Sequence, residues 1–220
     1  MVITGLGWFR DGAYGHTRGP SLDGGPEGGS LYSRLQADGI LPGPVPDFGR
    51  LSLAAKQICA AVGAGLRDAG CSAGCAPREV IGIIGNGSAV EANRAFFDDY
   101  VSNGRQMARG SLFVYTLPSS PLAAPAQCYT LNGPLIHFRH ARDGVAHIVD
   151  RAVELLAQRL ADAMVVVYED ATGILGCVVR PDAEGGHAAV LSAAALKERA
   201  GHVQSVSDLV NDVTTKGKTD

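Results

Sequence analysis

The residues best suited to chemistry are His137, Arg139, His140 and Arg142, with Asp143 directly after them. Guanidinium groups bind carboxylates and phosphates through paired hydrogen bonds. They stay protonated, so neither arginine can act as a nucleophile. The pattern therefore indicates binding rather than covalent chemistry. Arg142 and Asp143 can also form an ion pair, and Asp143 stands where a helix N-cap is expected.

A turn, a strand and a long helix are predicted to position these side chains. Gly133-Pro134 marks the turn, and residues 135–138 form a mostly apolar run of strand length. From residue 145 onward, apolar residues recur on one helical face, at Val145, Ile148, Val149, Ala152, Leu155, Leu156 and Leu160. Such a junction stabilises anions and lowers the pKa of a cysteine placed there. This chain instead has Ala141-Arg142-Asp143, with no Cys, Ser or Thr.

Other motifs are weaker candidates for chemistry. Ser119 and Ser120 offer two hydroxyls, but neither lies in a Gly-x-Ser-x-Gly elbow, and only His137 or His140 is near in sequence as a base. Cys128 falls inside a predicted helix and reads as a packed small residue. The histidines match no metal-ligand spacing, so neither a metal nor a cofactor is expected.

Composition restricts the classes of function. The chain has 220 residues, of which 46% are hydrophobic and 6% aromatic, so the core must consist of Ala, Val, Leu and Ile. Its 29 glycines and its Ala-rich helices suggest close packing of helices on a sheet.

A formal charge of −3 without a basic patch argues against nucleic acid as a partner. Apolar runs of only strand length predict no membrane span, and no signal peptide is recognisable at the N-terminus. Five scattered cysteines indicate a reducing, cytoplasmic setting.

Predicted strands alternate with predicted helices along the chain. This order favours parallel βα units in a layered α/β/α domain with a mainly parallel central sheet. The predicted strands begin at Val2 and cover 79–85, 113–116, 135–139, 164–168, 173–180 and 188–191. The predicted helices cover 51–69, 89–101, 122–131, 145–160 and 194–199.

Two segments depart from that alternation. Residues 10–50 are rich in Gly and Pro, and they are predicted as a long loop with one helical turn around 31–37. Residues 203–220 end in a polar stretch and are expected to be a mobile tail. The domain is therefore assigned to residues 1–202.

Four motifs, in this order, resemble the N-terminal half of a β-ketoacyl synthase, which has a thiolase-like fold. Val2-Ile3-Thr4-Gly5-Leu6-Gly7 is similar to the opening strand and turn of that family. Ile81-Gly82-Ile83-Ile84-Gly85-Asn86-Gly87-Ser88 resembles its glycine-rich second strand and turn. Leu117-Pro118-Ser119-Ser120-Pro121 resembles a segment before a helix at the subunit interface. Gly133-Pro134 and the strand after it resemble the approach to the active-site turn.

The resemblance implies that the nucleophile is replaced. Ketosynthases carry a Thr-Ala-Cys-x-x-Gly-type sequence at the active-site turn, where this chain has His140-Ala141-Arg142-Asp143-Gly144, one residue shorter. No catalytic residue is therefore assigned. The family also has a second half, which supplies two histidines, and 220 residues are expected to hold the first half only. The resemblance thus implies a thiolase-like half-fold without condensing activity of its own.

The function implied by the resemblance is that of a chain-length-factor-type subunit, a pseudoenzyme in fatty acid, polyketide or aryl-polyene biosynthesis. Its partner would be an active ketosynthase or a second copy, bound through an apolar surface around residues 117–131. The residues expected to bind are Ser119, Ser120, Arg139, His140, Arg142 and Asp143, with Arg142 closing a former acyl pocket.

Two alternatives remain open. The chain could bind acyl-CoA or acyl carrier protein by itself, with Arg139 and Arg142 contacting phosphate. It could also be an acyltransferase or hydrolase with a relocated nucleophile, either a serine at 119 or 120 or Cys128.

Overall fold

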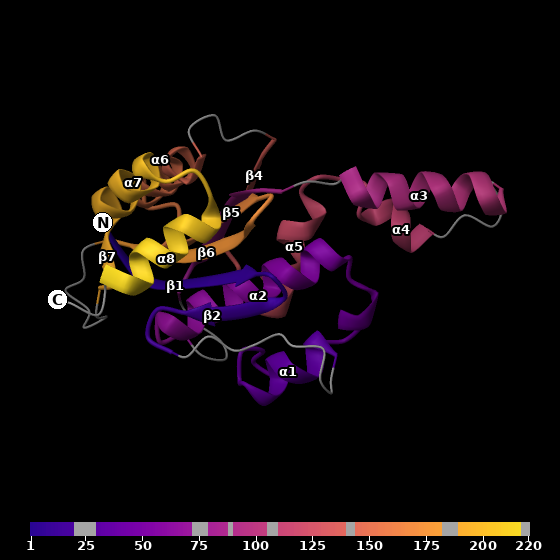
Figure 1. The fold of residues 1–220 in the computed structure, drawn as a ribbon, viewed down its shortest axis with the longest axis horizontal. Coiled ribbons are helices and arrows are strands. Elements are labelled where there is room, and N and C mark those ends of the chain that lie inside the picture. The colour runs from indigo at the N-terminus through magenta and orange to yellow at the C-terminus, as the bar shows by residue number, and fades with distance from the viewer. Residues whose placement is uncertain are drawn as a thin grey trace.

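The computed structural model describes residues 1–19, 30–71, 79–87, 90–104, 110–139, 144–181 and 189–216. Within these residues one seven-stranded sheet has the order β2-β1-β6-β5-β3-β4, and β7 also pairs with β1 (Figure 1). The strands are β1 (Val2–Arg10), β2 (Ala13–His16), β3 (Ile81–Asn86), β4 (Leu135–Phe138), β5 (Ala163–Asp170), β6 (Gly173–Arg180) and β7 (Leu191–Ser192). The α-helices are α1 (Leu31–Ala37), α2 (Leu53–Asp68), α3 (Val90–Asn103), α4 (Gly110–Val114), α5 (Ser120–Cys128), α6 (Gly144–Ala157), α7 (Ala193–His202) and α8 (Val206–Lys216).

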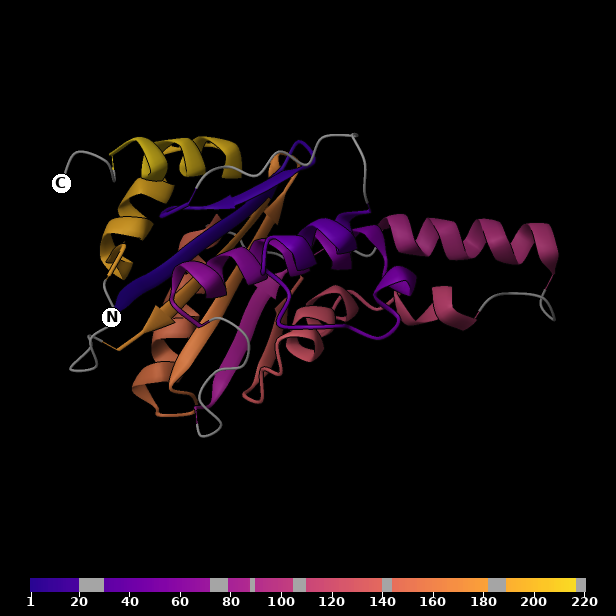
Figure 2. The ribbon, with the colours of Figure 1, turned by 90° about the horizontal axis from the view of Figure 1, so that it is seen from below.

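The sheet is sandwiched between two layers of helices, as the layered α/β/α prediction requires. One hydrophobic cluster joins the sheet to α1, α2 and α5, and a second joins it to α6, α7 and α8. Successive residues of β5 alternate between the two clusters, with Val165 and Val167 in the first and Met164 and Val166 in the second. Both faces of the central strands are therefore buried. The view in Figure 2 shows α2 and α6 on opposite sides of the strands.

The prediction of a mainly parallel sheet is wrong. β3 pairs in parallel with β4 and β5, whereas the β1–β2, β1–β6, β1–β7 and β5–β6 pairs are antiparallel. Two of the antiparallel pairs, β1–β2 and β5–β6, are tight hairpins. Asp11 and Gly12 have φ angles of 50° and 77° between β1 and β2, as a type I′ turn requires. The β5–β6 turn is closed by Asp170, whose carboxylate accepts hydrogen bonds from the N–H groups of Thr172 and Gly173.

Three local predictions also need correction. The segment 10–50 contains β2 and a 3-10 helix (Phe48–Arg50) as well as the predicted turn of helix, which is α1. Residues 113–116, predicted as extended, lie at the end of α4 and in the turn after it. Residues 206–216 form α8 rather than a mobile tail, because Val206, Leu209, Val210 and Val213 recur at helical spacing and are buried against the sheet.

Helices α3 and α4 form an arm that extends away from the sheet and its covering helices (Figures 1 and 2). The arm is held together by the Phe96 and Phe113 rings, whose centroids lie 5.5 Å apart in an edge-to-face arrangement. Asn93 donates a hydrogen bond to the Thr116 carbonyl oxygen and thereby fastens α3 to the segment that follows α4. The arm and the turn after α4 leave several large apolar side chains in solvent, namely Val90, Phe97, Tyr100, Val101, Phe113, Val114 and Leu117.

Candidate functional site

Polar groups gather where the parallel strands β3, β4 and β5 end. Ligands of α/β proteins bind at the carboxyl ends of such strands. The group, called here the carboxyl-edge cluster, consists of Asn86, Gly87, His137 and Glu169. The Asn86 side chain donates to the Glu169 carbonyl oxygen and accepts from the Glu169 N–H, both at 2.8 Å, and so joins the ends of β3 and β5. The His137 Nε2 atom lies 3.3 Å from the Gly87 carbonyl oxygen, which fixes the imidazole to the same edge.

The segment before α5 also reaches this edge. A methyl group on Gly87 would lie 3.4 Å from the Glu169 carboxylate and 3.8 Å from the Pro118 carbonyl oxygen. Ser119, the next residue, is the N-cap of α5 and is half-buried. Ser120 donates its hydroxyl to the Val114 carbonyl oxygen at 2.5 Å, which ties α5 to the end of α4. The structure therefore brings the predicted 118–120 segment close to the β3–β5 edge.

Of the remaining predicted binding residues, the structure describes only Arg139. Arg139 follows β4 directly and is exposed. His140, Ala141, Arg142 and Asp143 lie outside the described residues, so their assignment as binding residues stays a prediction.

A relocated nucleophile gains no support from this geometry. The Ser120 hydroxyl and the His137 ring each bond a backbone carbonyl oxygen and not each other. The Cys128 Sγ atom lies 3.8 Å from Cys59 Sγ at the packed interface of α2 and α5. The hydrogen bond from Cys59 lowers the pKa of Cys128, whereas burial raises the pKa of Cys59. Only 8% of the surface of Cys128 is exposed to solvent, so a substrate cannot reach it readily.

Cysteine reactivity tests this packing. Burial raises the pKa of the Cys177 thiol to about 12, so almost none of it is thiolate near pH 8. Cys71 is half-buried, and an Arg180 Nη atom lies 3.2 Å from its sulfur. We expect iodoacetamide to alkylate Cys71 at least about ten times faster than Cys177 in the native protein, as followed by peptide mass spectrometry. The same two thiols should react at similar rates in urea. Equal rates in the native protein would contradict the burial of Cys177.

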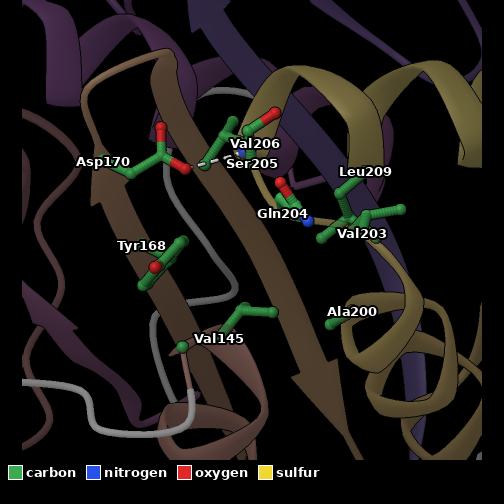
Figure 3. Close-up of a pocket in the computed structure, with 10 residues that line it drawn as sticks. Val145, Tyr168, Asp170, Ala200, Val203, Gln204, Ser205, Val206 and Leu209 are labelled. Atoms are coloured by element: carbon green, nitrogen blue, oxygen red, sulfur yellow. Dashed lines mark hydrogen bonds between the residues drawn. The ribbon is translucent and has the colours of Figure 1, made fainter.

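A cavity adjoins the β5 end of the same edge and was not predicted. It has a volume of about 210 Å³ and is lined by Gly144, Val145, Tyr168, Asp170, Ala200, Val203, Gln204, Ser205, Val206 and Leu209 (Figure 3). Tyr168 immediately precedes the Glu169-Asp170 pair at the end of a buried strand, and that position is the only signal in the sequence for this cavity.

Within the described ranges, no three His, Cys, Asp or Glu side chains gather as metal ligands. In the same ranges, no helix has the length and apolar content needed to span a membrane.

Comparison with known proteins supports the fold. No protein-family model and no curated protein matches the chain. The structure resembles a solved one described as "The ishigamide ketosynthase/chain length factor", with a TM-score of 0.57 and 16% sequence identity. The match covers 86% of this chain but 64% of that one, so the chain spans less than two thirds of its structural neighbour. The likeness confirms the ketosynthase-like, layered α/β fold predicted from the four motifs, and at this identity it shows the fold alone.

Proposed function

We propose that this chain is a non-condensing partner subunit of chain-length-factor type, which pairs with an active ketosynthase or with a second copy of itself. The pathway would be fatty acid, polyketide or aryl-polyene biosynthesis. Residues 1–202 would be the ketosynthase-like domain, and α8 packs onto it. Three observations support the proposal: the ketosynthase-like fold, the sequence Ala141-Arg142-Asp143 at the expected nucleophile turn, and the exposed apolar arm.

The exposed apolar side chains of the arm are the main support for pairing. Phe97, Val101, Phe113 and Leu117 are each more than half exposed, with values of 64%, 65%, 57% and 56%. Exposed apolar side chains of this size are typical of interaction surfaces, because leaving them in water is unfavourable. Aromatic side chains are also the usual energetic centres of protein interfaces. The arm is therefore the surface that we assign to the partner.

Two other surfaces are less suited to this task. The surface expected around residues 117–131 is largely internal, since Leu122, Ala124, Cys128 and Tyr129 are buried in the first hydrophobic cluster. The outward face of α6 is charged and carries an Arg151–Glu154 ion pair and a Lys197–Asp150 ion pair. Charged residues are depleted at the centres of interfaces. Pairing through the arm thus fits the described surface better than pairing through α5 or α6.

Light scattering of the protein, alone and mixed with a ketosynthase encoded beside it, tests the proposal. We expect a mixed dimer or a homodimer, and Phe97→Ser combined with Phe113→Ser should weaken it at least about 100-fold, because each aromatic anchor contributes about 2 kcal/mol. Arg151→Ser, on the charged face of α6, is the matched control and should pair like the wild type. A wild-type chain that stays monomeric at about 50 μM with and without the synthase would refute the proposal.

Binding of acyl-CoA or acyl carrier protein remains a second candidate, supported by the exposed Arg139 beside the carboxyl-edge cluster. A thermal shift with acyl-CoA that Arg139→Gln abolishes would favour it. A cytoplasmic location belongs to the main proposal and rests on the five scattered cysteines.

A further inference from the structure

The cavity between β5, α6, α7 and α8 is a separate feature of the molecule and uses none of the arm residues. It is called here the α6–α8 cavity. Figure 3 shows Tyr168 and Asp170 on one side of it, Val145 at one end, and the residues of α8 and the preceding loop on the other side. Its volume of about 210 Å³ exceeds the roughly 150 Å³ of an engineered cavity that holds benzene, so it has room for a small organic molecule.

One part of the cavity wall is apolar, and polar side chains form the rest. Val145, Val206 and Leu209 belong to the second hydrophobic cluster and are at most 3% exposed, so the wall they form is continuous with the core. Ala200 and Val203 complete the wall from the end of α7 and the loop after it. This wall favours an apolar ligand body, because water there makes few hydrogen bonds.

Two uncharged polar side chains that line the cavity, Tyr168 and Gln204, have no hydrogen-bond partner among the described residues, and the Tyr168 hydroxyl is the less exposed of the two. The Tyr168 hydroxyl lies over the first residue of α6, since a methyl group on Gly144 would be 3.6 Å from its oxygen. Among the described residues, no group hydrogen-bonds to this hydroxyl. Burial, and secondarily the charge of Asp170, raise the pKa of Tyr168, so the hydroxyl keeps its proton near neutral pH. It is therefore available to donate to a ligand oxygen.

The carboxylate that lines the cavity, Asp170, already has hydrogen-bond partners. The Asp170 carboxylate accepts the Val206 N–H at 2.8 Å and the Thr172 N–H at 2.7 Å. Among the described residues that line the cavity, none is Lys, Arg or His. An anionic ligand would lose its hydration without gaining a counter-ion from these described residues, and it would be repelled by Asp170. The lining therefore selects an uncharged hydrogen-bond acceptor.

We propose that the α6–α8 cavity binds a small uncharged carbonyl compound with a branched or cyclic apolar body, whose carbonyl oxygen accepts a hydrogen bond from Tyr168. The apolar body contacts Val145, Val206 and Leu209. This site is independent of the pairing proposed above and would function in a monomer as well as in a dimer.

Titration of the ¹⁵N-labelled protein with two probes, followed by NMR, tests the site. The first probe is 4-methyl-2-pentanone, and the second is 3-methylbutanoate, a carboxylate of similar size and branching. We expect the ketone to shift the amides of Val145, Tyr168 and Leu209 with a dissociation constant on the order of 1 mM. The carboxylate should bind at least about ten times more weakly, since it lacks a counter-ion in the cavity.

Three variants assign the binding to named residues. Tyr168→Phe should weaken ketone binding about tenfold through loss of one hydrogen bond. Ala200→Leu should abolish it by filling the space, provided that its melting temperature shows it folded. Tyr100→Phe, a matched change on the exposed arm, should have no effect. The proposal is overturned if the wild type shows no saturable shift up to about 20 mM ketone, if the carboxylate binds as well, or if Tyr168→Phe binds like the wild type.

Discussion

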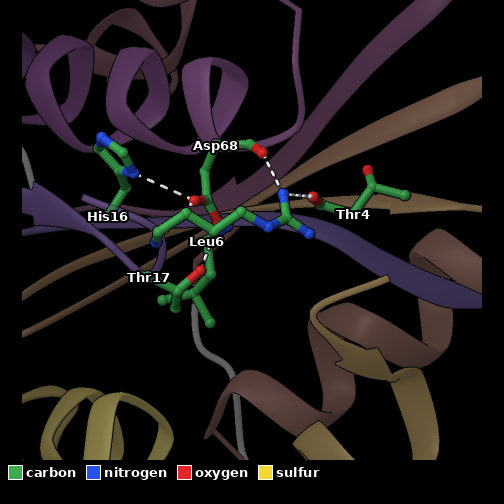
Figure 4. Close-up of polar contacts among 6 residues, drawn as sticks. Thr4, Leu6, His16, Thr17 and Asp68 are labelled. Carbon is green, nitrogen blue, oxygen red and sulfur yellow. Dashed lines mark hydrogen bonds and ion pairs between the residues drawn. The ribbon is translucent and has the colours of Figure 1, made fainter. Parts of the chain in front are cut away.

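Replacement of Asp68 by Asn is expected to lower the free energy of unfolding by about 3 kcal/mol at neutral pH. Asp68 is the last residue of α2, and its side chain is fully buried. Its carboxylate accepts hydrogen bonds from the N–H groups of Leu6 and Arg18 at 3.0 Å each, from the Thr17 hydroxyl at 2.5 Å and from His16 Nδ1 at 3.0 Å. Figure 4 shows Leu6 of β1, His16 at the end of β2 and Thr17 just after β2 grouped around Asp68.

The physical reason for the loss is a mismatch of donors. An asparagine amide replaces one acceptor oxygen with an NH2 group, which then faces donors that the carboxylate had satisfied. Each buried donor left without a partner costs about 1–3 kcal/mol. A loss of about 3 kcal/mol corresponds to a fall of about 6–12 °C in melting temperature for a chain of this size. Urea denaturation and thermal unfolding both measure it.

The effect should depend on pH in a defined direction. Burial alone would raise the pKa of Asp68, but the hydrogen bonds from His16, Thr17, Leu6 and Arg18 outweigh it and hold the pKa below its ordinary value. A carboxyl group with a lowered folded-state pKa contributes stability above its unfolded pKa of about 4 and loses it as the pH falls further. The stability difference between wild type and Asp68→Asn should therefore shrink below about pH 4.

A matched control separates this effect from a general change of charge. Asp98→Asn removes the same charge from the exposed surface of α3 and should change stability by no more than about 0.5 kcal/mol. If Asp68→Asn were as stable as Asp98→Asn at pH 7, the carboxylate would not be holding α2 to the β1–β2 hairpin.

Periodicity made most of the sheet and its helices predictable from the sequence. The apolar run Gly173–Arg180 predicts the strand that is β6, and the composition of Leu31–Ala37 predicts the helical turn that is α1. The β1–β2 hairpin was missed, although Asp11-Gly12 is a strong turn signal, because the Gly- and Pro-rich residues after it suggested a continuous loop. α4 is not predictable from local sequence, because Phe113 and its neighbours have a high propensity for strands. In the structure Phe113 packs on Phe96 of α3, and the segment that carries Phe113 is helical.

The site was less predictable than the fold, for a physical reason. The segment 118–120 and His137 could be proposed from local motifs, since each adjoins a predicted strand or helix. Asp68 could not, because its four donors lie 50 to 62 residues away in the chain and meet it only after β1 and β2 pair. The α6–α8 cavity was likewise missed, because it depends on α8, which the polar composition of the last residues concealed.

α2 packs closely on the sheet, as the Gly- and Ala-rich composition suggests. Substitution of a glycine at this contact is therefore expected to cause a large loss of stability. A methyl group on Gly7 of β1 would lie 2.3 Å from the Gly65 nitrogen and 2.5 Å from the Ala61 carbonyl oxygen. A methyl group on Gly65 would in turn lie 2.7 Å from the Gly176 carbonyl oxygen of β6. The helix thus rests on the strands through backbone atoms, which cannot move aside as a side chain can.

Gly7→Ala is therefore expected to destabilise the protein by about 3 kcal/mol, because the added methyl group pushes α2 away from β1. Gly176→Ala, whose methyl group would lie 2.8 Å from the Ala61 carbonyl oxygen, should cost less than Gly7→Ala. Gly49→Ala is the control, since no atom lies within 4 Å of its added methyl group and it should stay within about 0.5 kcal/mol of the wild type. Urea denaturation of the three variants ranks these costs. A Gly7→Ala variant as stable as Gly49→Ala would mean that α2 does not lie in backbone contact with β1, and the anchoring of α2 by Asp68 would then need a different geometry.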